Sequence, residues 1–106
     1  MRMHKILVPV DGSVSSKNMA KYAATLAASK NALVVLLHVH DPVPVTIGGQ
    51  AAVEVRKAMD AESAKLLAGF AAIVEGAGAK CVPLTREGSP GHAIVRVQEE
   101  EDCDLI

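Results

Sequence analysis

Short apolar runs, each ended by turn-forming residues, divide the chain at intervals. Residues 5–10 (KILVPV) form the first run, which stops abruptly at an Asp-Gly-Ser turn. Residues 33–39 and 80–85 form the second and third runs. Runs of this length are typical of strands buried on both faces of a parallel sheet. Pro83 restricts the third strand to an edge position, because proline has no N–H to donate to a neighbouring strand.

Segments with helical periodicity follow each run, at residues 15–30, about 50–75 and about 91–100. The positions expected to face the sheet are Met19, Ala20, Ala23, Leu26 and Ala27 in the first helix, Val55, Met59, Ala64, Leu67, Ala71 and Val74 in the second, and Ala93, Ile94 and Val97 in the third. Residues 104–106 look like the opening of a fourth strand. The order βαβαβα, with right-handed crossovers, predicts an α/β fold with a doubly wound parallel sheet.

Capping and turn residues support these boundaries. Ser13 or Ser15 can cap the first helix, and Asn31 can end it in a left-handed conformation. Residues 40–49 hold two prolines and two glycines, which predicts an irregular loop at the carboxyl edge of the sheet. Ser89 precedes a proline and is expected to be the N-cap of the third helix.

Composition describes one globular domain over residues 1–106, with half of the residues apolar. A net charge of −1 gives no electrostatic attraction to nucleic acid, and no apolar run approaches the roughly 18 residues of a membrane span. The start of the chain leads directly into a strand without a signal peptide, so we expect a cytoplasmic protein. Cys81 and Cys103 fall on non-adjacent strands of the expected sheet, which predicts two free thiols.

The first turn also indicates a binding site. Asp11 lies at the carboxyl end of the first strand, where open α/β sheets bind their ligands. Gly12 allows the tight turn, and Ser13 is favoured as a helix cap over a ligand contact. From the residues alone, a second interpretation is equally good: Asp11 is only a turn residue that caps the helix with its carboxylate.

Four segments together resemble the universal stress protein family: residues 5–13 (KILVPVDGS), 33–39 (LVVLLHV), 88–94 (GSPGHAI) and 102–106 (DCDLI). The resemblance covers the whole chain. It implies the Rossmann-like fold of the adenine nucleotide alpha hydrolase type, with strand order 3-2-1-4-5. The fourth and fifth strands are largely absent here, and the chain looks truncated before the glycine-rich loop (G-x-x-G, nine residues, G-[S/T]) of the nucleotide-binding members.

The same resemblance implies a site for ATP or a related adenine nucleotide. Asp11 matches the residue that accepts hydrogen bonds from the ribose hydroxyls, Pro9 and Val10 match positions beside the adenine, and Val39 matches a residue whose backbone pairs with the adenine edge. His40 approaches the same edge and is a further candidate contact. A homodimer and a stress-response role with at most slow ATP hydrolysis are implied as well.

Two other functions stay open. A member of this family without the glycine-rich loop can be an interaction protein that binds no nucleotide, and an enzyme of the wider adenine-binding group is a third possibility, although its usual His-x-x-His or PP-loop motifs are absent from the sequence. The four histidines are spread over three segments, which argues against a metal site. The acidic run at residues 99–102 is expected to be a solvated surface patch.

Overall fold

Three parallel strands form the sheet of the computed structural model, which describes residues 4–44 and 46–104. β1 (Lys5–Pro9) pairs with β2 (Leu33–His40), and β2 pairs with β3 (Lys80–Glu87), so the order β1-β2-β3 agrees with the predicted 3-2-1. β3 is two residues longer than expected because its pairing with β2 continues to the end of both strands. The predicted α/β fold with a parallel sheet is confirmed.

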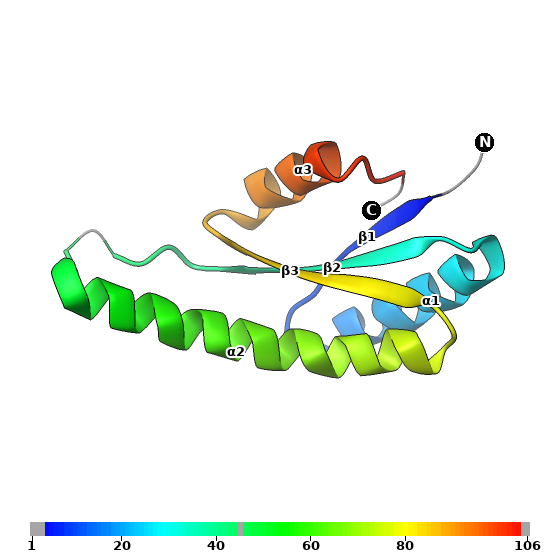
Figure 1. Cartoon of the computed structure of the whole chain (residues 1–106), viewed down its shortest axis with the longest axis horizontal. Helices are drawn as coiled ribbons and strands as arrows, with labels where there is room; N and C mark the ends of the chain where they lie inside the picture. The colour runs from blue at the N-terminus through cyan, green and yellow to red at the C-terminus, as the bar shows by residue number, and fades with distance from the viewer. Residues whose placement is uncertain (1–3, 45, 105–106) are drawn as a thin grey trace.

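Helices cover both faces of this sheet (Figure 1). α1 (Val14–Lys30) and the long α2 (Gly49–Gly76) lie on one face, and α3 (Pro90–Glu100) lies on the other. None of the described helices is long and apolar enough to cross a lipid bilayer. The predicted fourth strand falls largely on residues 105–106, outside the described residues. At its start, the N–H of Asp104 donates to the carbonyl of Lys5 at 2.9 Å, so the chain passes beside β1 there.

Small side chains bring α1 close to the sheet. Its buried residues lie along one face of the helix and are mostly alanine: Ser16, Ala20, Ala23, Ala24 and Ala27. The prediction that Met19 faces inward was wrong, because Met19 is 56% exposed on the flank of this stripe. Alanines on the packing face allow the helix backbone to approach the sheet, which turns the longer neighbouring side chains outward.

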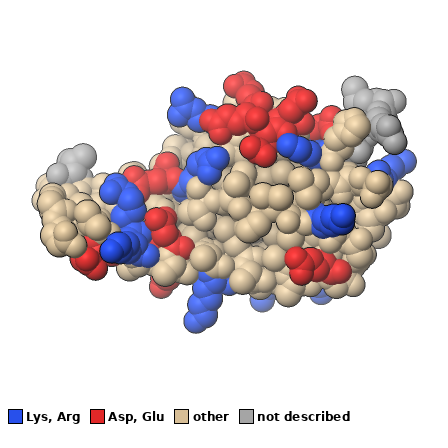
Figure 2. Space-filling view, in the orientation of Figure 1, with Lys and Arg blue, Asp and Glu red and all other residues tan. Residues whose placement is uncertain are grey.

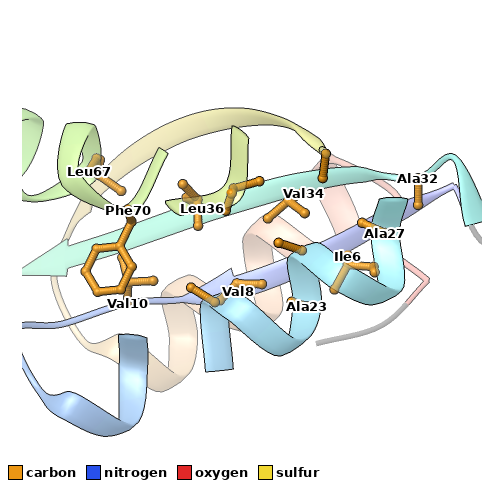
Figure 3. Packing of buried hydrophobic residues seen from close by; sticks show 14 residues of the cluster. Ile6, Val8, Val10, Ala23, Ala27, Ala32, Val34, Leu36, Leu67 and Phe70 are labelled. Carbon is orange, nitrogen blue, oxygen red and sulfur yellow. The ribbon is translucent and has the colours of Figure 1, made fainter. Parts of the chain in front are cut away.

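α2 buries Ser63, Leu67, Phe70 and Val74, and the ring of Phe70 lies against Val10 beyond the end of β1 (Figure 3). The prediction that Ala64 belongs to the packing face was wrong, since Ala64 is exposed. The buried positions 63, 67, 70 and 74 repeat at intervals of three and four. Ser63, and not the apolar Ala64, therefore faces the sheet.

Two predictions concern the ends of helices, and one of them is confirmed. Asn31 ends α1 at φ 54°, in the left-handed region, as predicted. Ser89 lies at the N-cap position of α3, but its side chain makes no capping hydrogen bond, so the predicted capping role of that side chain was wrong. Pro83 lies on the edge strand β3. The N–H of Gly88 donates to the carbonyl of His40 on β2. Because backbone groups alternate in direction along a strand, the backbone nitrogen of Pro83, five residues earlier, points away from β2.

The two cysteines are free thiols, as predicted. Cys103 is buried with Leu7, Val35 and Val97 in the core on the α3 face, and Cys81 is half-buried on the α2 face. Burial raises the pKa of both thiols above the ordinary value.

Candidate functional site at the carboxyl edge of the sheet

Asp11 organises the turn between β1 and α1. Its Oδ1 accepts hydrogen bonds from the backbone N–H of Ser13 and from the hydroxyl of Ser16, each at 2.8 Å. Ser16 Oγ in turn accepts from the Asp11 N–H at 3.0 Å, and Ser13 Oγ accepts from the Ser16 N–H at 3.1 Å. Ser13 is therefore the N-cap of α1, as predicted, and Asp11 does have the turn role that the sequence left as one of two alternatives.

These bonds leave half of the carboxylate unused. The Ser13 hydroxyl and backbone N–H, and then the Ser16 hydroxyl, lower the pKa of Asp11 to about 2, so the group is ionised at neutral pH. The residue is exposed, and none of the hydrogen bonds among the described residues involves its Oδ2. Asp11 can thus hold the turn with one oxygen and accept from a ligand with the other.

β1 and β2 end at different heights, which leaves a step in the sheet. The paired register stops at Pro9 opposite Leu37, and the last bond runs from the Val10 N–H to the Leu37 carbonyl at 2.8 Å. Backbone groups of successive residues on a strand point alternately to the two neighbouring strands. The backbone groups of Leu33 and Leu37 bond to the β1 side, whereas the carbonyl of His40 bonds to the β3 side. The N–H and C=O of Val39 therefore point to the β1 side. Among the described residues, no backbone hydrogen bond continues the β1–β2 ladder to Val39, whose N–H and C=O border the step.

The predicted site residues divide between the two sides of this step. Pro9, Val10, Asp11, Gly12 and Ser13 lie on the β1 side. Val10 is 5% exposed and its side chain belongs to the core, so it offers a ligand only its backbone. The remaining two, Val39 and His40, end β2 and line a cavity of about 280 Å³ together with Met59, Glu62 and Ser63 of α2.

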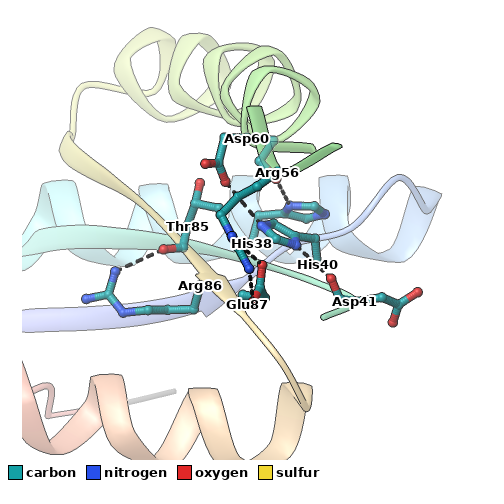
Figure 4. Close-up of polar contacts among 9 residues, drawn as sticks. His38, His40, Asp41, Arg56, Asp60, Thr85, Arg86 and Glu87 are labelled. Atoms are coloured by element: carbon teal, nitrogen blue, oxygen red, sulfur yellow. Dashed lines mark hydrogen bonds and ion pairs between the residues drawn. The ribbon is translucent and has the colours of Figure 1, made fainter. Parts of the chain in front are cut away.

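His40 points under α2, with its side chain 9% exposed (Figure 4). Its Nδ1 contacts the Asp41 carbonyl at 2.9 Å and its Nε2 contacts Asp60 Oδ1 at 3.1 Å. The bond to Asp41, then the contact with Asp60 and the charge of Glu87, raise the pKa of His40 above its ordinary 6.5 against the effect of burial. His40 therefore links the sheet to α2.

His38, two residues earlier on β2, makes a second link. Its Nδ1 lies 2.7 Å from Ser63 Oγ. This distance suits a nucleophile and its base, but the Ser63 side chain is fully buried, which favours a structural role for the pair. Burial, and then the charge of His40, lower the pKa of His38 below 6.5.

Sequence reasoning missed the polar residues of α2 that meet this edge. Arg56 makes a paired contact with Glu87 of β3, from Nε to Oε1 at 3.1 Å and from Nη2 to Oε2 at 3.3 Å. Arg56, Asp60 and Ser63 continue the three-four spacing of the buried face toward the start of α2. That spacing, extended through polar positions, was the signal that could have found them.

A larger open cavity, of about 900 Å³, lies between the end of β3 and α3. Its lining residues include Arg86, His92, Arg96, Glu87 and Glu99. Neither Asp11 nor Val39 lines this cavity. Arg86 and Arg96 both contact Glu100, at 3.6 and 3.9 Å. Acidic side chains gather on the surface above α3 (Figure 2), where the predicted patch at residues 99–102 is mostly exposed but partly paired with these arginines and Lys5.

Comparison with protein-family models gives a match to the universal stress protein family over residues 3–106. The chain belongs to this family. No curated protein matches the chain significantly. The sequence-based recognition of the universal stress protein fold is thus confirmed across nearly the whole chain.

Solved structures of universal stress proteins and related proteins share the fold. The hypothetical protein MJ0577 is 25% identical with a TM-score of 0.86, and the match covers 100% of this chain and 74% of that protein. A universal stress protein in complex with cAMP is 22% identical, with a TM-score of 0.79 and coverage of 99% and 72%. The universal stress protein from Archaeoglobus fulgidus in complex with dAMP is 21% identical, with a TM-score of 0.67 and coverage of 97% and 78%.

Proposed function

We propose that this universal stress protein binds an adenine nucleotide at the step between β1 and β2. The observation that carries the proposal is the ionised, exposed carboxylate of Asp11, whose Oδ2 has no hydrogen bond among the described residues. A carboxylate oxygen accepts two hydrogen bonds, which suits the adjacent 2′- and 3′-hydroxyls of a ribose. Two relatives of the same fold were solved with adenine nucleotides, cAMP and dAMP.

The backbone of Val39 supplies the second half of the site. An adenine presents a donor and an acceptor side by side along one edge, and the N–H and C=O of a single residue match that pair. Val39 faces the β1 side beyond the last rung of the ladder at Leu37. The base would then lie across the step, beside Pro9 and the backbone of Val10, with its ribose toward Asp11.

ATP itself, action in the cytoplasmic stress response and self-association into a homodimer belong to the same proposal and rest on family membership. The proposed contacts concern the base and the ribose. The phosphate-binding loop of the nucleotide-binding members has no counterpart within the 106 residues. AMP is therefore the best probe, because most of its affinity would come from the two groups that this part of the chain can contact.

Isothermal titration of AMP into the parent chain, Asp11→Asn and Asp11→Ala tests the ribose contact. Asn retains a carbonyl oxygen for the Ser13 and Ser16 bonds but replaces the ligand-facing oxygen with a donor, so it separates the turn role from the ligand role. We expect Asp11→Asn to weaken AMP binding about tenfold or more with an unchanged circular dichroism spectrum. dAMP, which lacks one hydroxyl, should bind the parent more weakly than AMP and respond less to the substitution.

Equal AMP affinities for the parent and Asp11→Asn, with both folded, would overturn the role of Asp11. Absence of AMP binding at millimolar concentration by the folded parent would overturn the proposal as a whole and favour an interaction protein that binds no nucleotide.

A further inference from the structure

The packing face of α2 changes from apolar to polar along its length. Its members are spaced by three or four residues, and they are Arg56, Asp60, Ser63, Leu67, Phe70 and Val74. The last three are almost fully buried against the sheet. The first three meet the sheet only where β2 and β3 end, and all three are polar. α2 continues beyond the strands in that direction (Figure 1). Apolar burial therefore holds the second half of this helix, whereas the part before it contacts the sheet through polar side chains, of which only Ser63 is fully buried.

Three polar links make that attachment. His38 contacts Ser63 at 2.7 Å, His40 contacts Asp60 at 3.1 Å, and Arg56 pairs with Glu87 at 3.1 Å. His38 and His40 are two residues apart and lie on one face of β2, while Ser63 and Asp60 are three residues apart and lie on one face of α2. We call His38, His40, Asp60 and Ser63 the histidine clasp; Figure 4 labels His38, His40 and Asp60.

The two histidines occupy opposite environments. His40 is surrounded by acceptors and acids: the Asp41 carbonyl from the following loop, Asp60 from α2 and Glu87 from β3, with Arg56 engaged by Glu87. These groups favour the imidazolium form of His40.

His38 lies between β2 and α2, where its neighbours are the Ser63 hydroxyl, the charge of His40 on its own strand, the carboxylate of Asp11 from the turn after β1, and Glu62, which lines the same cavity. Burial is the largest effect on this ring and favours its neutral form.

We propose that the histidine clasp docks the first half of α2 in a proton-dependent way, closed when His40 is protonated and His38 is neutral. The folded pKa of His40 lies above 6.5, through the Asp41 carbonyl first and then through Asp60 of α2, so the His40–Asp60 contact is complete below pH 6.5 and is lost as the pH rises through the folded value. The folded pKa of His38 lies below 6.5, so acidification below pH 6.5 favours release of this ring from beneath α2. Docking is strongest near pH 6.5 and weaker on either side. This device does not depend on the proposed nucleotide.

Hydrogen–deuterium exchange of the nucleotide-free chain between pH 5 and 8.5, corrected for intrinsic exchange rates, tests the clasp. Amides of residues 50–63 should lose protection by a factor of about two to five at pH 8.5 relative to pH 6.5, the range of an ion pair with one exposed partner. A similar loss should occur toward pH 5. Amides of residues 67–76, held by apolar burial in the same helix, are the internal reference and should keep their protection.

Substitutions show which histidine causes the loss of protection above pH 6.5 and which causes the loss below it. His40→Gln should abolish the change above pH 6.5, and His38→Gln the change below it. Asp60→Asn is a second, well-tolerated variant that tests the change above pH 6.5, because the Asp60 side chain is 57% exposed. His92→Gln, at an exposed residue of α3, is the matched control and should leave both changes intact. Three results would overturn the proposal. Protection of residues 50–63 could be constant with pH, or it could change equally in residues 67–76. The third result is a loss of protection above pH 6.5 that persists in Asp60→Asn.

Discussion

Phe70 offers a quantitative test of how the core supports the candidate site. It is the single phenylalanine of the chain, it is 2% exposed, and its ring packs against Val10 immediately before Asp11 (Figure 3). Replacing it with alanine removes the ring from between α2 and the end of β1. We expect Phe70→Ala to destabilise the fold and to loosen the turn that holds Asp11.

The magnitude follows from burial. A buried phenylalanine removes on the order of 150 Å² from water, which at about 25 cal/mol per Å² corresponds to about 4 kcal/mol. Measured Phe→Ala substitutions in cores cost about 3–5 kcal/mol, which includes the cavity left behind. Such a loss is a large share of the roughly 5–15 kcal/mol typical of a domain of this size. Phe70→Leu, which refills most of the space, should cost about 1.5 kcal/mol or less.

Urea unfolding followed by circular dichroism measures these free energies. Tyr22→Ala is the matched control, because the chain's one tyrosine lies on α1 and is 73% exposed. It should change the free energy of unfolding by no more than about 0.5 kcal/mol. A cost below about 1 kcal/mol for Phe70→Ala, or similar costs for the two aromatic residues, would contradict the packing described above.

Two further predictions concern backbone conformation and acid stability. Asn31→Gly should preserve or raise the melting temperature, whereas Asn31→Ala should cost about 1 kcal/mol in urea unfolding, because only the second strains the left-handed end of α1; equal effects would contradict this. The backbone N–H groups of His4 and Lys5 lower the pKa of Asp104 below its ordinary 3.8, so the stability it contributes is present above pH 3.8 and is lost as the pH falls through its folded value. Asp104→Asn should accordingly show a smaller fall in melting temperature between pH 5 and pH 2.5 than the parent, and an identical fall would refute this role.

Much of the fold followed from local signals. The strands were predictable because residues buried on both faces form unbroken apolar runs, and the end of α1 was predictable because Asn31 tolerates a conformation that most side chains avoid. Met19 and Ala64 were misplaced for one reason. Hydrophobicity identifies which side chains prefer burial, but the face of a helix that meets the sheet also depends on how closely its backbone can approach.

The candidate site was predictable only in part. Asp11 stood out because a carboxylate interrupts an apolar run at the end of a strand. Asp60, Ser63 and Glu87 carried no such signal, since each is an ordinary polar residue in sequence and gains its role from the long helix that passes over the end of the sheet. Pairings between residues 25 or more apart, such as His38 with Ser63, depend on the register of strand and helix, which local patterns do not determine.

Pro83 has a consequence for how copies of this protein can meet. An edge strand normally offers a full row of donors and acceptors, which invites a second copy to extend the sheet. On β3 the outward-facing row lacks the N–H donor at position 83, near the middle of the strand. A strand from a second copy would therefore find a gap in the hydrogen-bond ladder at this position. The missing donor at position 83 therefore disfavours self-association of this chain by strand pairing along the β3 edge.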